Sequence, residues 1–108
     1  MGINSTEVSY GFGQIGSGFT DTTGGLRPPS GKVIIAIQFV SDSSFNLLEQ
    51  STADAENAYI GTRTQNSDLQ PGSLEIDSGN TFGAGTVIFG RWNEIRLATG
   101  SVIAYYGY

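Results

Sequence analysis

The chain has 108 residues and a formal net charge of −5, and it contains neither cysteine nor histidine. A chain of this length forms one domain with a single modest core. The missing residue types exclude disulfides, thiolate zinc sites and a cysteine nucleophile.

Charged residues make up only 14% of the chain, against roughly 25% in ordinary soluble domains, while glycine occurs 16 times. This composition is typical of a β-rich, turn-rich protein and argues against a helical cytosolic enzyme. The five basic residues are scattered, at Arg27, Lys32, Arg63, Arg91 and Arg96. Binding to phosphates or anionic lipids requires concentrated positive charge, so we expect neither a nucleic-acid nor a membrane partner.

Glycine recurs throughout residues 1–31, where a helix is disfavoured because each interior glycine costs about 1 kcal/mol relative to alanine. The aromatic residues between the glycines include Tyr10, Phe12 and Phe19. Two interpretations stay open. The segment is either an irregular arm or short strand over the domain's own core, or an extended arm whose aromatics anchor it on a neighbouring subunit. Pro28 and Pro29 then force an extended backbone that leads into the domain, residues 32–108.

The strongest predicted strand covers residues 32–40, because it is almost continuously apolar and rich in β-branched residues. A polar turn follows at 41–44, and residues 45–49 are predicted to return as a paired strand. In that strand Phe45 and Leu47 would face one way and Leu48 the other.

Residues 50–72 are polar and predict a long loop with a short strand near Tyr59 and Ile60, which would pin the loop to the core. A helical turn over 52–58 is the alternative. Short strands are predicted at 73–76 and 87–89, with a turn at 77–80. From Trp92 the alternation predicts a strand to Leu97, a turn at 98–101 and a last strand over 102–106. The elements together predict an all-β domain, an antiparallel β-sandwich or small barrel of jelly-roll-like type.

Candidate catalytic and metal-binding groups are few. Glu75 with Asp77, or Glu49 with Glu94, could meet as an acid and base pair, but nothing in the spacing favours either. The acidic and amide residues at 54–57 and 77–80 suit ordinary turns better than a calcium loop. The G-x-G-x-x-G pattern at 11–16 lacks a preceding strand and a following helix. We therefore expect no enzyme activity, no cofactor and no metal.

The aromatic C-terminus is the remaining signal. Tyr105 and Tyr106 are adjacent in a predicted strand, so they point to opposite faces and one of them is expected to lie outside the core. Together with Trp92 and Tyr108 they could form an intersubunit patch, pack in the core, or provide a platform for stacking sugars.

The string GTVIFGRWNEIRLATGSVIAYYG at residues 85–107 resembles segments of small virion proteins of tailed bacteriophages, and is most similar to those of capsid decoration or cement proteins. The resemblance covers roughly the last fifth of the chain. It implies a non-enzymatic structural protein that binds and bridges major capsid subunits on the virion surface. A tail, neck or fibre component is the related alternative, and so is a module whose loop 50–72 binds host-surface glycan.

A decoration protein needs contact area and not reactive groups. We expect the chain to self-associate as a homotrimer, to bind the major capsid protein, and to be made in the host cytoplasm, since the N-terminus lacks a signal-peptide pattern. The residues expected at the capsid and intersubunit interfaces are Tyr10, Phe12, Phe19, Arg27, Arg91, Trp92, Tyr106 and Tyr108.

Overall fold

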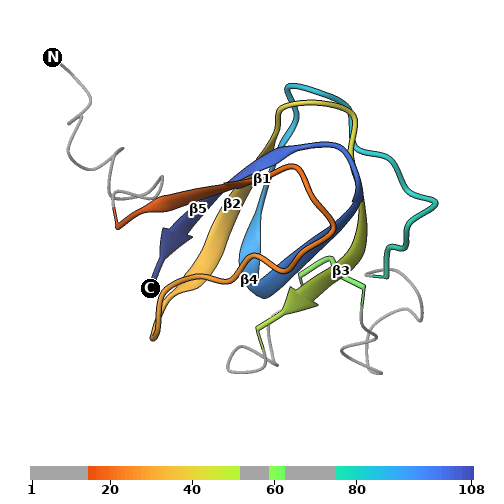
Figure 1. Cartoon of the computed structure of the whole chain (residues 1–108). Coiled ribbons are helices and arrows are strands. Elements are labelled where there is room, and N and C mark those ends of the chain that lie inside the picture. Colours follow the sequence, from red (N-terminus) through yellow and green to blue (C-terminus); the bar gives the residue numbers. More distant parts are fainter. Residues whose placement is uncertain (1–14, 52–58, 63–74) are drawn as a thin grey trace, which may run out of the picture.

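The computed structural model describes residues 15–51, 59–62 and 75–108 (Figure 1). These residues form strands, turns and extended segments and contain no helix. The all-β prediction is confirmed. The five strands are β1 (Ser17–Thr20), β2 (Val33–Phe39), β3 (Ser44–Gln50), β4 (Val87–Thr99) and β5 (Val102–Gly107).

All five strands belong to one antiparallel sheet in the order β1-β5-β2-β4-β3. The sheet curls, so that β3 and the second half of β4 face β2 and β5 across the core (Figure 1). One curled sheet thereby supplies both layers around a single core, the arrangement that a small all-β domain needs.

The strand predicted over 92–97 and the one predicted over 87–89 are a single 13-residue strand, β4. Its first half pairs with β2 and its second half with β3, and Trp92 pairs with Ile34 on one side and Gln50 on the other. Gly90 has no side chain where the Trp92 ring lies, since a Cβ at position 90 would stand 2.6 Å from that ring. Gly90 therefore allows the Trp92 ring to pack closely against the strand, and it does not form a turn.

β3 confirms the strand predicted over 45–49. Its ladder with β4 is irregular between Phe45 and Leu47, which pair with Leu97 and Arg96. This bulge adds a residue to one strand and shifts the side-chain alternation. Phe45 and Leu48 are consequently both fully buried, and the prediction that they face opposite ways is wrong.

β1 lies within the range 1–31 that the sequence analysis treated as an arm. It pairs with β5, and Leu26 forms a further bridge with Ile95 through hydrogen bonds of 2.9 and 3.0 Å. Residues 15–31 thus run along the domain's own sheet, as the first of the two interpretations expected. Residues 1–14 lie outside the described part of the chain.

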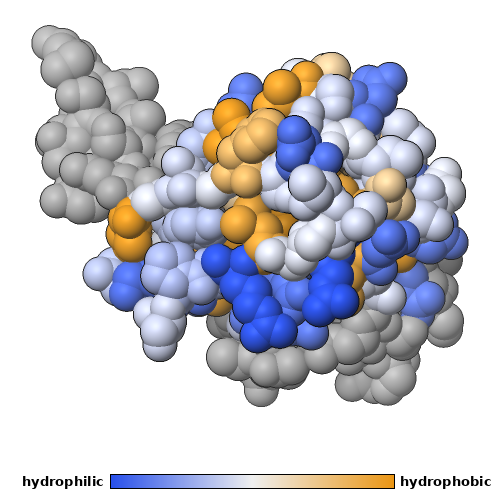
Figure 2. Space-filling model, viewed as in Figure 1, coloured by the Kyte–Doolittle hydropathy of each residue, from blue (hydrophilic) through white to orange (hydrophobic). Residues whose placement is uncertain are grey.

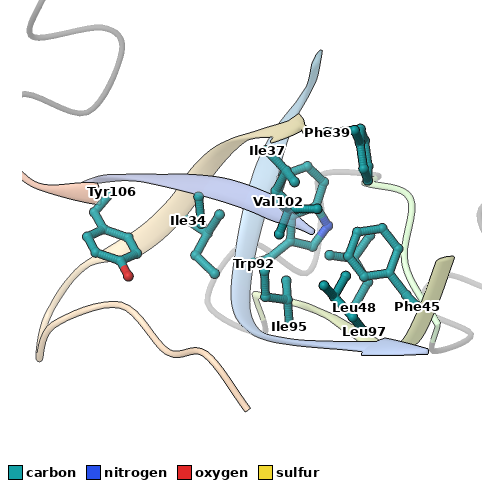
Figure 3. Packing of buried hydrophobic residues seen from close by; sticks show 11 residues of the cluster. Ile34, Ile37, Phe39, Phe45, Leu48, Trp92, Ile95, Leu97, Val102 and Tyr106 are labelled. Carbon is teal, nitrogen blue, oxygen red and sulfur yellow. The ribbon is translucent and has the colours of Figure 1, made fainter. Parts of the chain in front are cut away.

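The core joins both halves of the sheet. Figure 3 shows Tyr106 and Ile34 at one end, Phe39 and Phe45 at the other, and Trp92 between them. Phe82 closes the far end, because its ring stacks on Phe39 with the centroids 4.9 Å apart. The buried set is Ile34, Ile37, Phe39, Phe45, Leu48, Trp92, Ile95, Leu97, Val102, Ala104 and Tyr106.

The segments predicted as short strands at 59–60 and 73–76 contribute differently. Ile60 and Ile76 pack against the core, and Gly61 pairs with Glu75 in an isolated parallel bridge. Ile60 does pin its loop to the core, as predicted. The alternative helical turn over 52–58 and residues 63–74 lie outside the described residues.

Candidate interaction surface

The outward face of the β1-β5-β2-β4 half of the sheet is built from two rows of side chains. Residues paired across antiparallel strands point to the same face. The pairing therefore places Ser17, Tyr105, Ala36 and Phe89 in one row, and Phe19, Ile103, Gln38 and Val87 in the next. The intervening row faces the core: Ile37 and Ala104 in it are fully buried, and Ile88 is partly buried against the core. We call the eight residues of the two rows the outer face.

Large apolar side chains on the outer face are exposed. The exposed fraction is 57% for Phe19, 60% for Phe89 and 40% for Val87, and Val40, two residues beyond Gln38, is 50% exposed. With about 200 Å² of surface for each aromatic side chain, the two phenylalanines alone expose about 230 Å². The largest apolar patch on a typical monomer measures about 300–600 Å² and often serves a function.

The outer face carries no charged residue. Its two largest polar groups bind one another, since the Tyr105 hydroxyl donates a 2.8 Å hydrogen bond to Oε1 of Gln38. A solvent-facing sheet surface usually alternates polar side chains against the buried row. This one is uncharged and mainly apolar on its outer side too, as expected of a sheet that another layer covers.

Polar groups gather on a different part of the surface, around Glu94. This carboxylate is 5% exposed and accepts contacts of 2.8 Å from Arg27 Nη2 and 2.7 Å from Arg96 Nε. It also lies under Gly25, where a Cβ would stand 2.5 Å from Oε2. The hydrogen bond from Arg96 lowers the pKa of Glu94 most, burial opposes this, and the charge of Arg27 lowers it further.

This arrangement bears on one of the two acid and base pairs that the sequence left open, Glu49 with Glu94. Glu49 and Glu94 are indeed register partners across β3 and β4. A general acid needs a raised pKa, however, and Glu94 has a lowered pKa and both oxygens bound by guanidinium groups. Glu94 instead fastens the segment around residues 25–27 to β4, beside the Leu26 bridge.

A second polar cluster surrounds the C-terminal Tyr108, which is 75% exposed. Arg91 Nη1 donates a 2.7 Å hydrogen bond to the Tyr108 main-chain oxygen, and Lys32 Nζ lies 4.4 Å from the centre of its ring. Figure 2 shows one face of the molecule, on which hydrophobic residues gather above the centre and a group of strongly hydrophilic residues lies below them, with other hydrophilic residues at the upper right.

The residues that the sequence predicts for interfaces lie in several separate parts of the structure, and two of them lie in the core. Phe19 lies on the outer face, Arg27 beside Glu94, and Arg91 beside Tyr108. Trp92 is fully buried and Tyr106 is 7% exposed, so neither offers a surface to a partner. Their large rings fill the space between the two halves of the sheet, which corrects the expectation that they act as interface groups.

Two further predictions can be placed. Tyr10 and Phe12 lie outside the described residues. Of the adjacent pair Tyr105 and Tyr106, the first is half-buried on the outer face and the second is in the core, as the alternation predicted. Burial raises the pKa of Tyr106.

The sequence analysis missed Val40, Val87 and Phe89 as surface residues. Residues 87–89 are all apolar, so the alternation gives no sign of which side faces the core. The adjacent Gly90, which makes room for Trp92, was the signal that could have placed residue 88 inside and residues 87 and 89 outside.

The turn residues considered as metal ligands are engaged locally. Asn80 Oδ1 accepts from the Asp77 amide at 2.9 Å, and Asp77 Oδ1 accepts from the Gly79 amide at 2.8 Å. Gly16, the last glycine of the G-x-G-x-x-G pattern, leads into a strand and not into a helix. Among residues 15–51, 59–62 and 75–108, no three acidic side chains form a cluster suited to a metal ion, and no helix could cross a membrane.

No protein-family model matches the chain, and neither a curated protein nor a solved structure has significant similarity to it.

Proposed function

We propose that the chain is a non-enzymatic structural protein of a tailed-bacteriophage virion, a capsid decoration protein that binds and bridges major capsid subunits. The observation that carries the structural role is the apolar, uncharged outer face. A face of this kind costs free energy when it stays in water, and a subunit of a larger assembly recovers that free energy on docking. The resemblance of residues 85–107 to virion proteins supports the particular assembly.

In this proposal the chain self-associates as a trimer on the capsid surface, and each copy touches several shell subunits. Each contact can be weak, because simultaneous attachment at several points raises the overall affinity without any new contact. Attachment of this kind would hold neighbouring capsid subunits together against the outward pressure of the packaged genome.

The groups proposed to face the shell are the exposed polar and aromatic residues away from the outer face. Arg27 is 72% exposed on its side chain although it is paired with Glu94, and Tyr108 is 75% exposed. Arginine and tyrosine are enriched in protein interfaces because each combines a large apolar body with directional hydrogen bonding. Tyr10 and Phe12 would add aromatic anchors from the N-terminal segment.

The glycan-binding alternative concerns loop 50–72, most of which lies outside the described residues. On the outer face this alternative finds less support. Sugar sites combine an aromatic platform with several precisely placed polar groups. On the outer face Tyr105 and Gln38 use their hydrogen bond on each other, and the remaining large side chains are apolar. The composition therefore favours a protein partner.

The first test is the copy number of the chain in purified particles, measured by quantitative mass spectrometry against the major capsid protein. A ratio of about one, or about one third, is expected for a subunit that follows the shell symmetry. A handful of copies per particle would overturn the decoration role and favour the neck or tail.

The second test is direct binding of the purified chain to particles that lack it. The variant Tyr10→Ala/Phe12→Ala should bind more weakly than the wild type, whereas Asn46→Ala, a substitution at an exposed position on β3, should bind equally well. Equal binding of the wild type and the double variant would contradict the proposed role of the N-terminal aromatics.

A further inference from the structure

We infer that the outer face is the surface through which copies of this chain bind one another. Strands β2 and β5 carry apolar side chains on both faces, and this pattern is typical of strands covered on both sides. The curled half of the sheet covers the inner side. The exposed phenylalanines and valines mark the outer side as the one that still needs a layer.

Charge favours a second copy as that layer. The chain has 10 acidic and 5 basic residues, so two copies repel one another over most orientations. None of the eight residues of the outer face is charged. Contact through this face therefore brings no carboxylate opposite another carboxylate at the centre of the interface.

The shape of the face also suits self-association. Sheets pack face to face at about 10 Å, with their strands within about 30° of each other, when both surfaces carry interdigitating apolar side chains. A second copy presents the same rows and the same twist, so both surfaces bring apolar side chains to the contact. Phe19 and Phe89 lie at opposite ends of the two rows, on β1 and β4, and both are exposed.

The area is appropriate for a contact that forms within an assembly. A stable interface buries about 800 Å² on each partner, a little over half of it apolar. The two phenylalanines supply about 230 Å² of this, and Val40 and Val87 extend it. The outer face thus provides a large part of the apolar area of a standard interface, and the Tyr105–Gln38 pair lies between its exposed apolar residues.

The test uses the full chain and sedimentation equilibrium over concentrations from about 1 µM to about 1 mM. Wild-type protein is expected to form oligomers. Val87→Glu puts a carboxylate on the outer face, at the β4 end of its second row, against the apolar surface of its neighbour. Its dissociation constant should be at least about a hundredfold higher, because a charge buried at an interface loses its hydration.

Two controls separate contact from misfolding. Asn46→Glu adds the same charge at an exposed position on β3, in the other half of the sheet, and should associate like the wild type. Val87→Lys should also associate more weakly than the wild type, because it too places a charge in the contact. Far-UV circular dichroism of each variant verifies that the sheet is intact.

The inference is overturned if wild-type protein remains monomeric over this range, or if Val87→Glu associates as well as the wild type. A monomeric wild type whose Val87→Glu variant no longer binds particles would assign the outer face to the capsid subunit. That result would leave the proposed binding to the capsid standing, but not the proposed trimer. Conversely, self-association through this face together with no copies in purified particles would refute the proposed function alone.

Discussion

The hydroxyl of Tyr106 occupies the space that a Cβ on residue 18 would need, so the tyrosine ring lies directly over Gly18. Gly18 belongs to β1 and pairs with Ala104 of β5. The two small residues leave room for a ring that is 7% exposed at the edge of the core. This contact ties β1 to the rest of the sheet.

Gly18→Ala should therefore destabilise the domain by about 1–3 kcal/mol, the usual cost of forcing extra volume into a packed site. The measurement is urea unfolding followed by circular dichroism. Gly24→Ala is the matched control, because a Cβ at position 24 meets only Thr22 Oγ1, at an ordinary 3.5 Å. Equal losses in the two variants would contradict the close fit of Tyr106 over Gly18.

Trp92 stabilises the loop around Ile60. Its indole Nε1–H donates a 2.7 Å hydrogen bond to the Ile60 carbonyl, and the ring is fully buried. Trp92→Phe removes this donor and leaves a cavity, so it should cost about 2–3 kcal/mol in unfolding free energy.

Tyr105→Phe is the control for that substitution, since it removes a hydrogen bond donated by a half-buried aromatic residue to Gln38. Its expected cost is below about 1 kcal/mol, because water can replace the lost bond at an exposed surface. The unfolding of both variants must be followed by circular dichroism and not by tryptophan fluorescence, since Trp92 is the only tryptophan and one variant removes it. A smaller loss for Trp92→Phe than for Tyr105→Phe would refute the assigned role.

The contacts of Glu94 with Arg96 and Arg27 predict a stability that depends on pH. The pKa of Glu94 is lowered in the folded state from an ordinary value of 4.5. The stabilising contribution is therefore complete above pH 4.5 and is lost as the pH falls through the lowered folded-state pKa. Glu94→Gln should be less stable than the wild type at neutral pH, and the difference should shrink on acidification.

Urea unfolding of both proteins from about pH 7 to about pH 3 measures this difference. Arg96→Gln gives the matching cycle: in that background, Glu94→Gln should have a smaller effect, because the hydrogen bond that lowers the pKa most is already missing. A wild type and a Glu94→Gln variant of equal stability at every pH would rule out this contribution.

Two glycines with positive φ provide a test of crowding against backbone strain. Gly100 (φ +93°) turns β4 into β5, and a Cβ there would stand 2.5 Å from the Asp42 carbonyl oxygen. Gly85 (φ +88°) has open space around it. Gly85→Ala should cost about 1–2 kcal/mol from strain alone. Gly100→Ala should cost about 2–4 kcal/mol.

Thermal unfolding of the two variants gives the comparison. An additional shift for Gly100→Ala would reflect the contact of the β4–β5 turn with the 41–43 turn, where Ser43 Oγ also accepts from the Ser101 amide at 3.2 Å. Identical unfolding temperatures would show that strain alone governs both positions.

Local pattern alone was sufficient to predict the all-β class and several elements. Residues 33–39 are β-branched and apolar, so they form the central strand β2 wherever they are placed. Gly100 and Ser101 predict a turn before β5 for the same local reason. These features depend on the intrinsic preferences of a few neighbouring residues.

Tertiary structure decided which surfaces are buried. The pattern could not join residues 87–99 into one strand, because glycine within a strand normally signals a break, and only the packed Trp92 ring explains Gly90. It placed Trp92 and Tyr106 at interfaces, whereas the curl of the sheet encloses both. Nor could it identify the outer face, because Val87, Ile88 and Phe89 are equally apolar. Which of them remains in water depends on the side from which the other half of the sheet folds over, and that is a long-range contact.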